Sequence, residues 1–485
     1  MSVYIIGIGG SGAKFLEAVS YVAASGLYPE DIQTLLVDPD KGNGNLRECE
    51  NTLSIYRKTQ ACINRDNPDN NIAWMIRKIS AFESGLWSPF TEGKVRIRDA
   101  FKYDSYPENN AVKHLFDVLY TKEERDTDLK EGFRGRPSIG AGIMSLLSQE
   151  QKNQENWETL ISKIKDEKDA GKAPKVFLCG SIFGGTGASG FPTLGRLIAD
   201  ELDKESLLRD IKFGGLLMLP YFRFTPSRKD VSEGKVFAKS EEFILKTEAA
   251  LRYYSTKQLK FDTVYLLGTP NLANLENFST GGQNQRNFPH FLELYGALAL
   301  RDFLLTPKPN QLNIVTIGRK DSSLVSWDDL PDRNEVRSKL VTMTRFAFAW
   351  LSAIAPDLDN IRKGAREQQY IWYLKFFRKV KITDTQELDT FKQISEWVEN
   401  YLTWLGYIHD KPGGEEVKWF NSYNFWDSNN KSLKKERTNF SKLVEEIKGV
   451  ELNKILEGLN DKDIGAPKDG TVGLAKALYK AISQI

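Results

Sequence analysis

Short apolar runs rich in β-branched residues alternate with stretches of helical periodicity over the first 305 residues. Such a run predicts a buried strand, whereas apolar residues repeated every three or four positions predict an amphipathic helix. Strands alternating with helices are typical of a parallel sheet covered by helices on both faces, so we expect an α/β fold. The predicted strands lie at 3–6, 33–37, 176–179, 213–219 and 263–267.

Two predicted strands end in glycine-rich turns that lead directly into helical sequence. The first turn is GIGGSG at 7–12, and the second is GSIFGGTGASG at 180–190. Glycine allows positive φ and close approach of backbone N–H groups, and a helix start carries a partial positive charge. The carboxyl ends of parallel strands meet at one edge of a sheet, so the turns together predict a site for an anion such as phosphate.

The segment 41–136 is polar and rich in asparagine. We interpret it as a long insertion or decorated connection, with helix-like pieces near 72–82 and 111–120. A third glycine-rich stretch, RGRPSIGAG at 134–142, follows and is predicted to precede a helix at 143–147. Its two arginines and three glycines also suit an anion.

The stretch 288–304 is apolar almost all round, which predicts a buried helix. A proline-rich break follows at 306–310, then a strand-like run at 313–317 and a helix at 334–353. We therefore predict a domain at 1–305 that includes the buried helix, and a smaller C-terminal α+β domain at 306–485, mostly helical with some strand. The tryptophans and phenylalanines at 404–426 are expected to form part of its core.

Composition narrows the function classes. The 485 residues are 40% hydrophobic and 27% charged, as in an ordinary soluble globular protein. The net charge of +2 gives no indication of a direct nucleic-acid partner. No apolar run approaches the roughly 20 residues of a membrane helix, and the first residues do not resemble a signal peptide. Three scattered cysteines fit a reducing, cytoplasmic location, and three histidines without ligand spacing make a zinc site unexpected.

The first glycine turn by itself also fits a dinucleotide site. Gly7, Gly9 and Gly12 satisfy the G-x-G-x-x-G pattern. Asp38 follows the predicted strand 33–37, where a Rossmann fold places its ribose-binding acid. An NAD(P)-dependent oxidoreductase is therefore one interpretation. The turn is not a Walker A loop, because Ala13 stands at the lysine position and Lys14 comes one residue late.

Several motifs, in order along the chain, resemble those of the tubulin and FtsZ superfamily. Residues 184–187 (GGTG) resemble its GGGTG[ST] signature, and 7–14 (GIGGSGAK) resemble the first glycine loop of FtsZ. The segments VDPD, IGAG, LPYF and PN resemble further family motifs at 37–40, 139–142, 219–222 and 270–271. The predicted helix at 288–304 takes the place of the family's central helix. The resemblance spans 1–305 and implies a divergent bacterial tubulin-like branch with a Rossmann-type sheet.

The resemblance implies a GTP/GDP site with Mg²⁺ and without a Walker lysine. The first two glycine turns would hold the phosphates, and residues 140–142 would approach the γ-phosphate. Glu233 would reach the ribose, and Asn271 and Asn287 would contact the guanine base. Asp38 or Asp40 would orient Mg²⁺ through water. The residues assigned to the nucleotide are Gly9, Gly10, Ser11, Gly12, Lys14, Asp38, Gly140, Ala141, Gly142, Gly184, Gly185, Thr186, Gly187, Glu233, Asn271 and Asn287.

In this superfamily the nucleotide lies between subunits, and the following subunit supplies acids that orient the attacking water. Asp328 and Asp329 are the nearest match here, although charge stabilisation of the following helix explains them equally well. The chain departs from the signature at Phe183 and Ala188, and Lys14 replaces an asparagine. Nucleotide binding is thus better supported than rapid hydrolysis.

Three functions follow from these patterns. The leading one is a GTP-binding protein that assembles head to tail with itself and hydrolyses GTP at the subunit interface. The second is the NAD(P)-binding oxidoreductase, and the third is a non-hydrolysing nucleotide-binding scaffold whose C-terminal domain binds a partner protein. Some of these residues also have a purely structural interpretation. The glycine turn at 184–187 is then needed only for close packing, Lys14 is a solvated residue, and His290 is a buried core histidine.

Overall fold

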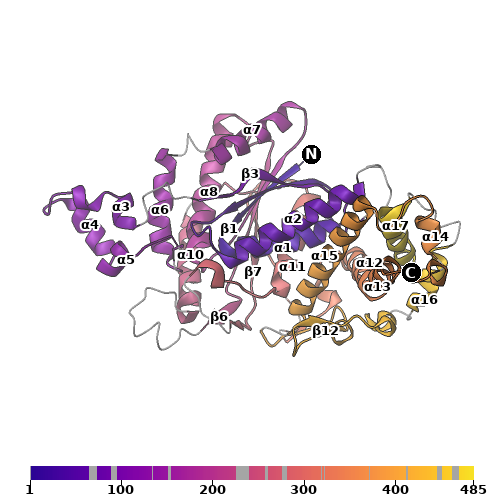
Figure 1. Cartoon of the computed structure of the whole chain (residues 1–485). Helices are drawn as coiled ribbons and strands as arrows, with labels where there is room; N and C mark the ends of the chain where they lie inside the picture. The colour runs from indigo at the N-terminus through magenta and orange to yellow at the C-terminus, as the bar shows by residue number, and fades with distance from the viewer. Residues whose placement is uncertain are drawn as a thin grey trace.

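The computed structural model confirms the α/β fold class, with a parallel central sheet between helices (Figure 1). It describes the chain except for residues 1, 65–73, 89–95, 131, 134, 151–154, 225–239, 257–259, 276–280, 318, 320, 322, 371, 411–412, 445–449 and 461–468. The sheet has seven strands in the order β3-β2-β1-β4-β5-β7-β9, and neighbours pair in parallel. The strands are β1 (Ser2–Ile8), β2 (Asp31–Val37), β3 (Ile79–Trp87), β4 (Lys175–Ser181), β5 (Lys212–Met218), β7 (Thr263–Leu267) and β9 (Asn313–Thr316).

Helices cover both faces of this sheet, and two successive glycines of β5 show why they pack closely. A Cβ on Gly214 would lie 2.4 Å from the ring of Phe303, and one on Gly215 would lie 2.5 Å from the ring of Phe191. Phe303 belongs to α11 (Phe291–Leu305) and Phe191 to α8 (Gly185–Lys204), on opposite faces. The other helices of these layers are α1 (Gly9–Ala24), α2 (Gly44–Asn64), α6 (Pro137–Glu150), α7 (Glu155–Asp169) and α10 (Phe243–Thr256).

Helix α11 is the predicted buried helix. Its side chains are buried around almost the whole circumference, and Gly296 lets it approach Leu216 of β5 and Phe15 of α1. It runs opposite to the strands: its first turn lies near Tyr221, just after β5, and its end lies near Lys212, where β5 begins. Lys212 donates to the carbonyls of Phe303 and Thr306 there.

The C-terminal part is mostly helical with some strand and packs beside α2 (Figure 1, right). Its aromatic residues are core, as predicted: Trp404, Trp419 and Trp426 are each less than 4% exposed. Its elements are β10 (Leu324–Val325), α12 (Arg333–Ala349), a π-helical turn (Trp350–Ile354), α13 (Ala355–Arg362), α14 (Tyr373–Phe376), α15 (Thr385–Ile408), β11 (Glu416–Val417), β12 (Trp426–Asp427), β13 (Ser432–Leu433), α16 (Leu452–Gly458) and α17 (Gly470–Ser483).

The structure corrects the organisation predicted for 41–136. The helix predicted near 72–82 is wrong, because Ile79–Trp87 forms the edge strand β3, with Ile79 opposite Ile32 of β2. A short apolar run does not distinguish a strand from a buried helix turn. Helix α2 and strand β3 are therefore parts of the main layers rather than an insertion. The sheet also continues past the boundary predicted near 306, because β9 pairs with β7.

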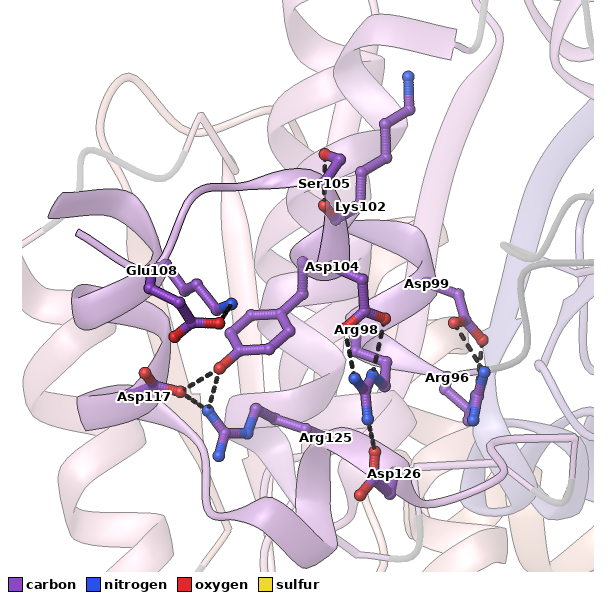
Figure 2. Close-up of polar contacts among 12 residues, drawn as sticks. Arg96, Arg98, Asp99, Lys102, Asp104, Ser105, Glu108, Asp117, Arg125 and Asp126 are labelled. Atoms are coloured by element: carbon purple, nitrogen blue, oxygen red, sulfur yellow. Dashed lines mark hydrogen bonds and ion pairs between the residues drawn. The ribbon is translucent and has the colours of Figure 1, made fainter. Parts of the chain in front are cut away.

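Residues 96–126 form a small helical outcrop, at the left of Figure 1, built from α3 (Ile97–Ala100), α4 (Ala111–Leu119) and α5 (Lys122–Asp126). The helix predicted at 111–120 is confirmed by α4. Figure 2 shows the polar contacts that hold this outcrop: Arg98 lies between Asp104 and Asp126, and Arg125 contacts Asp117. The outer face of α4 is apolar and more than half exposed, at Val112, Leu115, Val118 and Leu119.

Candidate functional site

The β1–α1 turn and the β4–α8 turn meet at the carboxyl edge of the two middle strands. Gly9 has φ +72, which favours glycine, and a Cβ placed on it would lie 3.3 Å from the Cβ of Thr186. The same Cβ would lie 3.5 Å from the amide nitrogen of Gly187. The two glycine turns predicted from separate parts of the sequence are therefore in contact.

Both helices that start at these turns begin without a side-chain cap. Ile8 is the N-cap of α1 and Gly184 is the N-cap of α8, and neither side chain accepts a hydrogen bond from the helix. The first N–H groups of a helix have no intrahelical acceptor, so two sets of donors are available where the turns meet. Two positive helix ends on adjoining strands form an arrangement suited to an anion.

Some residues of the two turns are exposed to a ligand, and others are buried. Gly10, Ser11, Gly184 and Thr186 are partly exposed, whereas their glycine neighbours are buried. A Cβ on Gly187 would lie 2.4 Å from the carbonyl oxygen of Ser181, so that glycine is needed for packing. Close packing also applies at three further predicted positions: Gly12 against Gly7, Gly185 against Phe133, and Gly140 against Ser189.

Residues 140–142 do not lie in a loop. They lie inside α6 (Pro137–Glu150), which packs along α8, and Gly142 faces the ring of Tyr120 in the outcrop. The third glycine stretch is helical because Ile139, Ile143 and Met144 supply a buried stripe for the contact with the rest of the domain. Its start still borders the site, since a Cβ on Gly185 would lie 3.3 Å from the nitrogen of Gly135.

Two buried carboxyl groups follow β2 at the same edge. Asp38 accepts the N–H of Asp40 at 2.9 Å, and Asp40 accepts the N–H groups of Gly42 at 3.0 Å and Gly282 at 2.6 Å. Burial raises the pKa of Asp38 to about 8; the hydrogen bond from Asp40 opposes this rise and the Asp40 charge adds to it. Asp40 thus organises the backbone, while Asp38 is a buried acid that a nearby cation would ionise.

An amide network, which the sequence reading missed, joins the start of α2 to residues 282–287. The side chain of Asn43 donates to Gln285 at 2.8 Å, and the amide of Asn45 donates to the carbonyl of Gln285 at 3.1 Å. Asn45 in turn accepts the N–H of Asn287 at 2.7 Å, and a Cβ on Gly10 would lie 3.0 Å from its side-chain nitrogen. The run GNGN at 42–45 was the available signal, and it was interpreted as part of an insertion.

Lys14 is buried rather than solvated, and its ammonium group lies 2.5 Å from the carboxylate of Glu17, one turn along α1. Glu293 of α11 lies nearby, fully buried, and burial raises its pKa to about 8 although the Lys14 charge opposes the rise. Neither Glu293 oxygen has a hydrogen-bond partner among the described residues. The lysine therefore balances acids between α1 and α11 instead of pointing to the turn.

The remaining predicted residues lie in varied surroundings. Asn271 lies beside Thr269 and Gly413, and Glu233 and Arg134 fall outside the described residues. Asp329 accepts from the amide and hydroxyl of Ser326 in a capping box, and Asp328 pairs with Arg333 at 2.5 Å.

His290 is a buried histidine, as expected. Its Nδ1 accepts from the Leu292 amide at 3.2 Å and caps α11. Burial lowers the pKa of this histidine to about 3, with a smaller contribution from the charge of Arg319. The imidazole is therefore neutral over the physiological pH range.

Two uncapped helix starts and the buried carboxyl group of Asp38 are what this edge offers to a ligand. Among the described residues, no three His, Cys, Asp or Glu side chains form a cluster that could hold a metal ion. Mg²⁺ commonly uses one or two carboxylates and completes its shell with phosphate oxygens and water, and Asp38 supplies one such carboxyl group. No helix in the described part of the chain is long and apolar enough to span a membrane.

Comparisons with known proteins add little to this geometry. The chain matches no protein-family model and no curated protein sequence. Among solved structures it is similar to a GTPγS-bound protofilament of CetZ2 from Haloferax volcanii, with TM-score 0.30, 13% identity, and 63% of this chain matched to 58% of that chain. It is also similar to CetZ from Methanosaeta thermophila strain DSM 6194, with TM-score 0.23 and 14% identity, and 55% of this chain matched to 45% of that chain. The fold assignment therefore rests on the sheet described above.

Proposed function

We propose that this chain binds a guanine nucleotide at the two glycine turns and associates head to tail in the manner of tubulin and FtsZ. The observation that carries the proposal is the contact between Gly9 and Thr186, which joins two uncapped helix starts on the middle strands. The order of motifs along the sequence, the seven-stranded parallel sheet and the buried helix α11 support the choice of family.

In this proposal the partly exposed residues of the turns contact the phosphates. The backbone N–H groups of Gly10, Ser11 and Thr186 donate to phosphate oxygens, with the Thr186 hydroxyl as a further donor. Asp38, as the ionised carboxylate, would hold Mg²⁺, which would neutralise phosphate charge. Asn287 is placed by Asn45 beside the β1–α1 turn and is the candidate for the base edge.

Hydrolysis is not part of this proposal. Asp328 and Asp329 are engaged in local capping and pairing, which accounts for both without a catalytic role. Lys14 is left out of the phosphate contacts because its ammonium pairs with Glu17. A nucleotide that is bound and slowly turned over agrees with both observations.

Two exposed apolar surfaces support association between copies. The first surface is the outer face of α4, in the outcrop. The outcrop lies beside the carboxyl edge of the sheet, because Arg136 pairs with Glu124 of the outcrop and its backbone lies against Gly185. The second surface is Leu305, Leu312 and Ile314, at the amino edge where α11 ends and β9 begins. Apolar surfaces at opposite edges of one chain suit a heterologous contact, which generates open filaments.

A dinucleotide is the second candidate, because the strand order and the acid after β2 also fit it. The order β3-β2-β1-β4-β5-β7 is that of a Rossmann sheet, and Asp38 follows β2. The glycine-rich start of α8 beside the β1–α1 turn, which provides a second set of phosphate donors, favours the nucleoside triphosphate or diphosphate.

Identification of the nucleotide retained by native purified protein separates the candidates. We expect GDP or GTP, released on denaturation and identified by chromatography. NAD(P) without guanine nucleotide would replace the first proposal with the second. If no nucleotide is retained, titration of the protein with GDP and with NAD in the presence of Mg²⁺ decides, and we expect saturable binding of GDP alone.

A further inference from the structure

A pocket lies away from the glycine turns, where the segment after β10 meets the segment after β11. Its volume is about 150 Å³, and it is formed by η5 (Trp327–Asp329), the first two turns of α12 and residues 418–421. A protein cavity of about 150 Å³ can take a molecule of the size of benzene. The pocket is therefore large enough for a small organic molecule.

The floor of this pocket is aromatic and fixed in place. The parallel pairing of β10 with β11 sets Val325 opposite Val417 and so brings the two segments together. The indole N–H of Trp419 donates to the carbonyl of Ser326 at 3.1 Å, and the ring centres of Trp327 and Trp419 are 6.3 Å apart. Both indoles are buried, so their edges form a preformed apolar wall.

The charged groups around the pocket are mostly cations. Arg333, Arg337 and Lys418 line it, and Asp328 is the single acid among the lining residues that the structure describes; with Glu416, which pairs with Lys418, the formal charge of these groups is +1. Arg337 lies over the ring of Trp327, with its guanidinium carbon 5.8 Å from the ring centre. Lys418 is half exposed and pairs with the half-exposed carboxylate of Glu416 at 3.8 Å, and exposed ion pairs of this kind are weak.

We infer that this pocket binds a small phosphate monoester that carries a flat ring. A phosphate monoester has a charge of about −1.5 to −2 at pH 7, which the three cations that line the pocket complement. Guanidinium groups bind phosphate oxygens in pairs, and the tryptophan edges accept the ring. Asp328 then serves to hold Arg333 in place. The inference does not depend on the proposed nucleotide site.

Calorimetric titration of the full chain with phenyl phosphate tests this inference. Separate titrations with inorganic phosphate and with phenol measure how tightly each half of the probe binds alone. We expect saturable binding of one phenyl phosphate per chain, at least tenfold tighter than either half. Lys418→Gln and Arg337→Gln should each weaken binding about tenfold, as expected for the loss of a charge-assisted hydrogen bond. Arg252→Gln is the matched control, because Arg252 lies exposed on α10 and pairs with Glu248 one turn away.

Lys418 is half exposed, so its variant is expected to fold even if the Arg337 variant does not. The absence of saturable binding, or an affinity that is unchanged in Lys418→Gln, would overturn the inference. Gly9→Ala separates the two sites: phenyl phosphate binding should survive this change. If Gly9→Ala removes it, the probe occupies the glycine turns and the pocket assignment is wrong.

Discussion

The glycine turns and the α3–α5 outcrop adjoin each other and are built in opposite ways. At the turns, buried side chains surround the backbone, and Gly10, Ser11 and Thr186 are partly exposed. In the outcrop, ion pairs between exposed or half-exposed side chains hold short helices together, and the apolar face of α4 points outward. The difference suits the turns to a small anion and the outcrop to a protein surface.

Gly9→Ala should have the largest effect. Alanine at φ +72 is strained by roughly 1–2 kcal/mol, and its Cβ would enter the space beside Thr186. We expect guanine-nucleotide affinity to fall more than tenfold, measured by calorimetry. Gly171→Ala is the control, because Gly171 has φ +74 and no atom within 4 Å of the added Cβ. Equal loss of binding in both variants would show that strain, not position, is responsible.

Asp38→Asn should change stability and its pH dependence. The pKa of Asp38 is raised to about 8 from 3.8, so wild type loses stability as pH rises from about 4 to about 8, where the unfolded chain has already released this proton. We expect the ligand-free variant to be more stable at pH 8, on the order of a few kcal/mol, and equal to wild type near pH 3.

Asp38→Asn should also weaken nucleotide binding with Mg²⁺ but not without it. Chemical denaturation at several pH values and calorimetry with and without Mg²⁺ measure the two effects. Asp359→Asn, at a surface pair with Arg362, is the control and should change neither. A variant as Mg²⁺-dependent as wild type would remove Asp38 from the site.

Val118→Asp tests the outcrop as a contact surface. Val118 is 83% exposed, so an acid should be tolerated in the isolated chain and should oppose burial against a second copy. We expect about a tenfold weaker self-association by analytical ultracentrifugation with GTP, with nucleotide binding retained. Leu312→Asp, on the opposite edge, should act alike. Leu374→Asp, on the exposed side of α14, is the control and should leave self-association unchanged. If all three aspartate variants weaken self-association equally, the contact is not specific to the two surfaces.

Arg98→Gln should have the smallest effect. Arg98 joins Asp104 and Asp126 near the surface, where ion pairs contribute little and are screened by salt. A slight decrease in thermal stability is expected at low salt, and none at about 1 M salt. A large decrease that persists at high salt would show that the outcrop depends on these pairs more than its exposure indicates.

The sequence was enough to predict the middle of the sheet and both glycine turns. Strands β1 and β4 are apolar over most of their length, and glycines at their ends mark the turns, so local signals agree with the fold. Strand β3 could not be distinguished in the same way, because its short run becomes a strand only by pairing with β2. Gly140 likewise lies in a helix because Ile139, Ile143 and Met144 form a buried stripe, and this depends on contacts with other elements.

The side-chain networks were the least predictable part. The link from Asn45 to Asn287 joins positions 242 residues apart. The charge of Lys14 is stabilised by Glu17 on the same helix and by Glu293 on another helix. Neither has a periodic signal, because each depends on elements that meet only in three dimensions. The backbone of the candidate site could therefore be predicted from glycine spacing, and its polar surroundings could not.

A structure of the protein with GDP and Mg²⁺ tests the central claim most directly. We expect the diphosphate between the β1–α1 and β4–α8 turns, within hydrogen-bond distance of Gly10, Ser11 and Thr186, with Mg²⁺ beside Asp38. A nucleotide bound away from these turns, or one whose ribose hydroxyls contact Asp38 as in a dinucleotide site, would contradict it.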